Sequence, residues 1–61
     1  MNIYVMKVEF LDDDDYLIET GLFSPSAKDV EAARDEIADE IERNNELYPS
    51  DNYDTTLIDV H

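Results

Sequence analysis

Carboxylates are the side chains of this protein that could do chemistry, because Asp and Glu account for 17 of its 61 residues. Two neighbouring carboxylates can act as a general acid and a general base. Among so many acids such pairs arise by chance, and no glycine-rich phosphate loop, nucleophile motif or zinc-ligand spacing accompanies them. We therefore expect no enzymatic activity and no cofactor.

The run Asp12–Asp15 offers oxygen ligands, which calcium and magnesium prefer. An EF-hand loop that began at Asp12 would need glycine at its sixth position and glutamate at its twelfth. This chain has Leu17 and Phe23 there, so the pattern fails. The only histidine, His61, is the last residue and is expected to fray, and there is no cysteine. We therefore expect no specific metal site.

The imbalance of charge is more informative than any pair of acids. Only four Lys or Arg residues oppose the 17 acids, which leaves a formal net charge of -13. A small domain usually mixes both signs and carries a net charge of about 2 to 8 in magnitude. A basic partner, a bound cation, a salty cytoplasm or disorder would each account for the excess. Anionic nucleic acids and membranes should be repelled, so direct binding of either is not expected.

The hydrophobic residues make up 43% of the chain and recur periodically, which favours one folded domain over residues 1–61 rather than disorder. Alternation predicts a strand over Asn2–Leu11 with four apolar side chains on one face: Tyr4, Met6, Val8 and Phe10. The aspartate run favours a turn, and a second strand over Tyr16–Phe23 should complete a hairpin. Gly21 is a candidate for a bulge or bend.

The next segment reads as a helix capped by Ser24 or Ser26 and ending near Asn44 or Asn45. Its apolar residues share one face at helical spacing: Ala27, Val30, Ala33, Ile37 and Ile41. A third strand is expected over Tyr53–Val60, with Thr56, Ile58 and Val60 on one face. The sequence therefore predicts an α+β fold, in which one helix packs on a three-stranded antiparallel sheet in the order strand, strand, helix, strand.

The four tyrosines divide into two pairs by position. Tyr4 and Tyr16 lie in the predicted strands and are expected to be core or half-buried residues. Tyr48 and Tyr53 flank a polar loop and are candidate anchors for an interface, where tyrosine is enriched.

The acids gather at three places: the aspartate run, the predicted helix and the C-terminal segment, which carries Asp51, Asp54 and Asp59. At about 100° per residue the helical acids fall off the apolar stripe and form two ridges. Glu31, Asp35 and Glu42 form one ridge with Asp39 close by, and Asp29, Glu36 and Glu40 form the other. The aspartate run and the helical acids make up the candidate surface for a basic partner: Asp12, Asp13, Asp14, Asp15, Asp29, Glu31, Asp35, Glu36, Asp39, Glu40 and Glu42.

With these acids, its small size and no catalytic motif, the chain resembles the phage-encoded DNA mimics. That group includes inhibitors of restriction enzymes, inhibitors of uracil-DNA glycosylase and some anti-CRISPR proteins. The resemblance is one of character and rests on no shared motif. It implies that the acids occupy the Lys/Arg-lined DNA path of a bacterial defence complex.

Among these inhibitors an anti-CRISPR is preferred, one that stops a type I surveillance complex from binding target DNA. The resemblance implies that it acts in the cytoplasm of a bacterial host. Its partner would be a basic DNA-binding protein or a CRISPR effector subunit, and it would act as a monomer or weak dimer.

Two other interpretations remain open. A housekeeping or adaptor domain from a halophile would also have an acid-rich, lysine-poor surface, and would need salt to fold. An acidic module that binds a basic protein, such as an antitoxin-like or histone-binding protein, would carry the same charge without imitating DNA.

Overall fold

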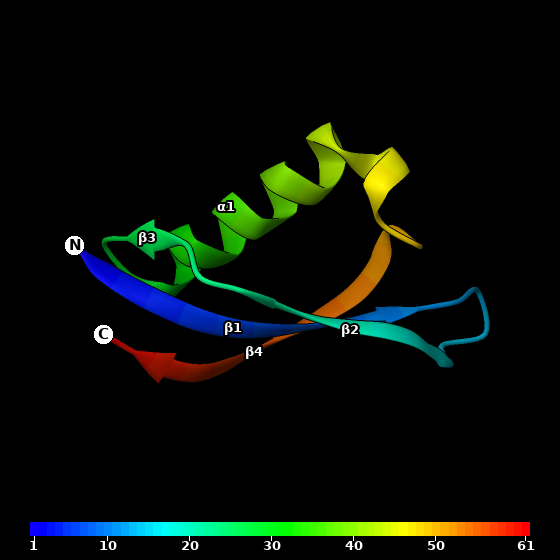
Figure 1. Cartoon of the computed structure of the whole chain (residues 1–61), viewed down its shortest axis with the longest axis horizontal. Helices are drawn as coiled ribbons and strands as arrows, with labels where there is room; N and C mark the ends of the chain where they lie inside the picture. The colour runs from blue at the N-terminus through cyan, green and yellow to red at the C-terminus, as the bar shows by residue number, and fades with distance from the viewer.

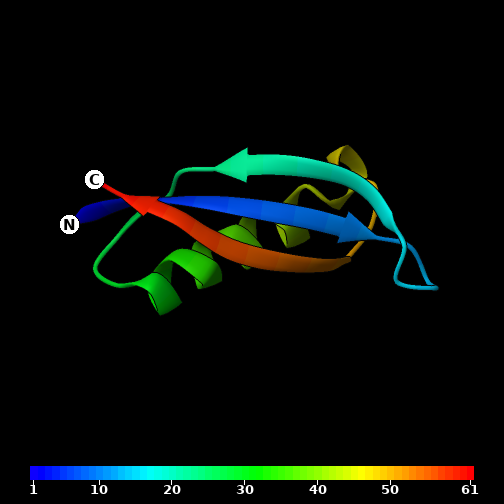
Figure 2. The same ribbon diagram turned by 90° about the horizontal axis from the view of Figure 1, so that it is seen from below.

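The strand β1, Asn2–Leu11, runs through the middle of the sheet. In the computed structural model, which describes all 61 residues, β1 pairs antiparallel with β2 (Leu17–Phe23) on one side and with β4 (Asn52–Val60) on the other. The short strand β3, Ser26–Ala27, pairs with the start of β1. Figure 2 shows β2, β1 and β4 side by side, with the helix behind them.

The α+β class, the single helix and the antiparallel sheet agree with the prediction, but the sheet has four strands rather than three. The additional strand arises because the chain continues along β1 after the end of β2. The carbonyl oxygen of Pro25 accepts a hydrogen bond of 3.0 Å from the Tyr4 N–H, and Ser26 and Ala27 then pair with Ile3 and Asn2. Because proline has no N–H to donate, Pro25 can only accept a hydrogen bond, and regular pairing with β1 resumes at Ser26.

Alternation along β1 places the core as predicted, because Tyr4, Met6, Val8 and Phe10 are all buried. Ala33, Ile37 and Ile41 complete the core from the helix. Ala27, predicted to lie on the same helix face, instead joins the core from β3. These eight residues lie between the sheet and the helix, and the other face of the sheet has no covering layer (Figure 1). Such a thin core gives a small margin of stability.

Aromatic rings close the core at the end of β1 that leads into the hairpin. The Phe10 ring stacks on Tyr48 at 5.5 Å between centroids and meets Tyr53 at 6.1 Å. Tyr48 also contacts Phe23, at 5.8 Å. The two tyrosines predicted as interface anchors therefore support the core. The expectation of a half-buried Tyr16 is wrong, since 72% of that residue is exposed just before β2 begins.

The helix α1, Val30–Arg43, begins later than its predicted serine caps. The residue before it, Asp29, is the N-cap, and its carboxylate accepts a hydrogen bond of 2.8 Å from the Ala32 N–H. Ser24 and Ser26 were expected to cap, but the pairing of β3 with β1 holds that part of the chain in extended form. The helix ends at Asn44, whose N–H donates to the Glu40 carbonyl oxygen at 3.1 Å.

Asp29→Ala is expected to lower the free energy of unfolding by about 1 kcal/mol, because it removes the acceptor for an otherwise unpaired helical N–H. Ser24→Ala should have almost no effect, since that side chain caps nothing. Urea unfolding followed by circular dichroism measures both. Equal stability of the two variants would contradict the cap assignment.

The strand β4 carries a bulge that the sequence did not reveal. The register with β1 shifts between Val5 and Met6, so that Leu57 lies opposite Met6 and Val60 lies opposite Tyr4. Both therefore face the helix side of the sheet, and the predicted grouping of Val60 with Thr56 is wrong. The extra residue at the bulge, Ile58, reverses the alternation of β4 beyond it, which is why Val60 and Thr56 face opposite sides.

Two further local predictions need correction. Gly21 pairs regularly with Val8, and the irregularity in β2 lies opposite Phe10 and Leu11 instead. His61 is not frayed: it exchanges hydrogen bonds of 2.9 and 2.8 Å with Ile3 and so extends the pairing of β4 with β1.

Candidate acidic interface

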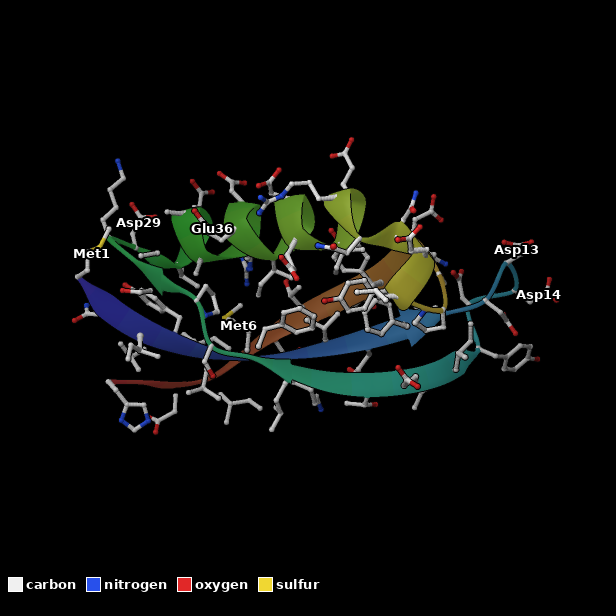
Figure 3. All side chains as sticks on the ribbon, turned by 45° about the horizontal axis from the view of Figure 1, so that its top comes forward. Met1, Met6, Asp13, Asp14, Asp29 and Glu36 are labelled. Carbon is white, nitrogen blue, oxygen red and sulfur yellow. The ribbon has the colours of Figure 1, made fainter.

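The helix α1 holds a row of carboxylates in fixed positions. Ala33, Ile37 and Ile41 anchor one side of the helix in the core, so the opposite side faces solvent. Figure 3 shows oxygen-tipped side chains along the part of the helix that points away from the sheet. Five exposed acids make up this row, called here the helix row: Glu31, Asp35, Glu36, Asp39 and Glu42.

The spacing of the helix row is close to that of charges along DNA. An α-helix rises about 1.5 Å per residue, so Glu31 and Glu42 lie about 16 Å apart along the axis. Five carboxylates over that length amount to roughly one for every 3 to 4 Å. One strand of duplex DNA carries one charge for about every 3.4 Å of axis.

The two flanks of the helix also carry acids. Glu42 and Asp51 line a groove of about 320 Å³ between the end of α1 and the start of β4. On the opposite flank, Glu36 and Glu40 line a depression of about 200 Å³ beside Phe23 and Pro25. Acids of the two predicted ridges therefore border hollows on opposite flanks of the helix, and apolar side chains also line each hollow.

Basic side chains neutralise little of this charge. Arg43 contacts two acids of the helix, with Nη2 3.0 Å from an Asp39 Oδ2 and 4.0 Å from a Glu40 Oε2. The other ion pairs join Lys7 to Glu9 at 4.0 Å and His61 to Asp59 at 3.1 Å. All of these pairs are exposed and stabilise the fold only slightly. The surface consequently keeps a strong negative potential.

Two of the predicted interface residues on and beside the helix have structural roles. Asp29 caps the helix and sits at its positive end, where a carboxylate is favoured. Glu40 is half-buried, and its Oε1 accepts a hydrogen bond of 3.4 Å from the Tyr48 hydroxyl. Partial burial, the negative charge of Glu40 and this hydrogen bond all raise the pKa of Tyr48 above its usual value.

Tyr48 is expected to make the protein less stable at high pH. Below pH of about 10 the phenol is protonated in both states, and the stabilising effect of its raised folded-state pKa is complete. As the pH rises through the raised pKa, the unfolded chain releases the proton more readily and that stability is lost. Tyr48→Phe should reduce the alkaline fall in the free energy of unfolding, whereas Tyr16→Phe, at an exposed site, should not. Identical alkaline profiles for Tyr48→Phe and the unmodified protein would contradict this.

The aspartate run is divided between structure and surface. The Asp12 Oδ1 accepts hydrogen bonds from the N–H groups of Asp14 and Tyr16, at 2.9 and 3.0 Å. Asp15 has a positive φ of 64°, and its Oδ1 accepts a hydrogen bond of 2.9 Å from the Asn52 side chain. Asp12 and Asp15 thus build the turn, which leaves Asp13 free at its tip together with the side chain of Asp14.

The structure does not bring the aspartate turn and the helix row onto one surface. Asp13 and Asp14 lie at the far end of the hairpin, which projects beyond the helix (Figures 1 and 3). Sequence reasoning did not identify Asp51 as part of the helix surface, because only the fold of the loop before β4 brings it beside Glu42. The helix row is therefore the continuous part of the predicted interface.

No group of three or more His, Cys, Asp or Glu side chains is arranged to hold a metal ion. None of the helices has the length and apolar character needed to cross a membrane. Comparison with protein-family models, curated proteins and solved structures found no match to this chain. A function is therefore inferred from the chain's own residues.

Proposed function

We propose that this protein is an inhibitor that imitates DNA and occupies the Lys/Arg-lined DNA-binding surface of another protein. The observation that supports this is the helix row, whose exposed carboxylates have, on average along the helix axis, about the density of charges on a DNA strand. The helix is fixed to the sheet by three buried residues, so the row is already ordered before it meets a partner. Preordered charges lose less conformational entropy on binding than charges on a flexible tail.

Electrostatics would govern the recognition. Opposite potentials accelerate encounter, and complementary charges fix the orientation of the bound protein. Of the five acids in the helix row only Asp39 has a basic group within 4.0 Å. The other four are available to Lys or Arg of a partner at no cost of broken ion pairs.

The resemblance to phage-encoded DNA mimics extends the proposal to a class of target. In this form the protein is an anti-CRISPR that acts in the cytoplasm of a bacterial host. It would bind a type I surveillance complex where the complex first engages duplex DNA, and would exclude the target by occupying its place.

The test is displacement of DNA from a purified type I surveillance complex. We expect the protein to release a labelled target duplex, as measured by fluorescence anisotropy, and to do so less effectively as salt is raised from about 50 to about 200 mM. Unstructured polyglutamate of equal charge is the control, because it carries the charge without the helix. Circular dichroism at low salt should show a folded protein throughout.

Three outcomes would count against the proposal. Failure to displace DNA from this complex would exclude it as the target. Failure to displace DNA from other basic DNA-binding channels would exclude the proposed function. Equal displacement by polyglutamate would show that the fixed array is irrelevant. Loss of structure at low salt would favour a halophile surface that needs salt to screen its own repulsion.

A further inference from the structure

The face of the sheet opposite α1 carries large apolar side chains with nothing packed over them. Even-numbered residues of β1 point into the core, so the odd-numbered ones from Ile3 to Leu11 point the other way, together with the residues paired opposite them. We call this surface the open face. Three of its aliphatic residues are largely uncovered: Ile3, Leu17 and Leu22 are 45%, 57% and 68% exposed.

We propose that two copies of this chain associate through their open faces, sheet against sheet, in a two-fold symmetric dimer. The proposal does not depend on the proposed function, because the acids of the helix row lie on the other side of the molecule. It accounts for apolar side chains that a monomer leaves in water, which normally mark an interaction site.

The charge of the chain permits this arrangement. The carboxylates on the open face are Glu9, Asp54 and Asp59, and Lys7 lies among them. Most of the other acids belong to the helix and the hairpin turn. When sheets stack about 10 Å apart and each helix lies a similar distance further out, the two helices are separated by roughly 30 Å. At physiological salt the Debye length is about 8 Å, so repulsion between them is screened.

The size of the open face suits a weak dimer. The molecule measures 35 × 22 × 15 Å, and Figure 2, which views the sheet along the 22 Å direction, shows the strands spread over the other two dimensions. The backbone footprint is therefore roughly 500 Å², to which the side chains at its margins add. A standard interface buries roughly 600 to 1,000 Å² on each partner, so the open face can supply an interface at the lower end of that range.

The centre of the open face is complementary to itself. Lys7 and Glu9 are neighbours on this face of β1, with Nζ and Oε1 4.0 Å apart. A two-fold axis that passes between them, across the strands, places Lys7 of each copy over Glu9 of the other and Val5 over Leu11. Aligned sheets pack at about 30° to each other, but groups this close to the axis are displaced little by that rotation.

Sedimentation equilibrium over a range of concentrations tests the proposal. We expect the unmodified protein to reach twice the mass of the chain. Leu22→Glu should raise the dimer Kd by at least about tenfold, because it buries an unpaired charge in the interface. Leu47→Glu is the matched control: Leu47 is equally exposed, at 71%, but lies off the sheet, so this variant should dimerise normally.

A charge exchange tests the orientation. Lys7→Glu should weaken the dimer, and addition of Glu9→Lys to that variant should restore it. Monomeric mass at every concentration would overturn the proposal. So would a dimer that survives Leu22→Glu but is broken by Thr55→Pro, since that result would indicate pairing through the free edge of β4 instead. Circular dichroism of each variant confirms that a loss of dimer is not a loss of fold.

Discussion

The combined reversal Asp35→Lys, Glu36→Lys and Asp39→Lys is expected to weaken binding to a basic DNA channel by at least about 100-fold, because three attractive contacts become repulsive. The three residues lie on the exposed side of α1, and none of them belongs to the core. Each reversal makes the charge more positive by two, so the net charge changes from -13 to -7. Competition with labelled duplex measures the loss, and circular dichroism should show an unchanged fold.

A second triple variant separates the helix row from overall charge. Asp13→Lys, Asp14→Lys and Glu19→Lys give the same net charge, at exposed sites on the hairpin and away from the helix row (Figure 3). We expect this control to lose much less affinity, since only long-range attraction is reduced. Equal losses in the two variants would indicate that net charge alone drives association. Full inhibition by the first variant would exclude the helix as the binding surface.

Phe10→Ala should remove a large part of the free energy of unfolding. Loss of a buried phenylalanine costs about 3–5 kcal/mol. Proteins have about 0.05–0.15 kcal/mol of stability per residue, which is roughly 3–9 kcal/mol for a chain of this length. Phe10 is 1% exposed and joins the hairpin strand to Tyr48 and Tyr53, so the cavity cannot collapse without separating these parts. A core of eight residues has little with which to compensate.

The matched substitution for Phe10→Ala is Leu22→Ala, which shortens an aliphatic side chain that is 68% exposed. Its effect on the free energy of unfolding should stay within about 0.5 kcal/mol. Urea unfolding followed by circular dichroism compares the two under dilute conditions. A free energy of unfolding for Phe10→Ala close to that of Leu22→Ala would show that the aromatic cluster is not central to the core.

Some elements were predictable because their signal is local. The alternation of Tyr4, Met6, Val8 and Phe10 selects one face of β1, and a strand with one apolar face must bury it. The helical spacing of Ala33, Ile37 and Ile41 provides the cover for that face. Side chains that repeat with the period of a strand or helix need no knowledge of distant residues to be assigned.

Other features depend on residues that are far apart in the sequence, and the sequence did not predict them. The helix is capped by Asp29 because Ser26 and Ala27 pair with β1. This pairing holds the segment that contains the predicted serine caps in extended conformation. Tyr48 and Tyr53 are partly buried because the segment after the helix brings both rings against Phe10. No local pattern in either segment reports these contacts.

The amino-acid sequence by itself determined the charge, the apolar faces and hence an acidic domain with one helix on an antiparallel sheet. Only the tertiary structure decided which carboxylates are free. Asp12 and Asp15 serve the turn, Asp29 caps the helix and Glu40 meets Tyr48, whereas the helix row remains exposed. The physical reason is that Asp and Glu carry the same chemical group wherever they stand in the sequence. Only the neighbours of each carboxylate in space determine whether it is hydrogen-bonded within the fold or exposed to a partner.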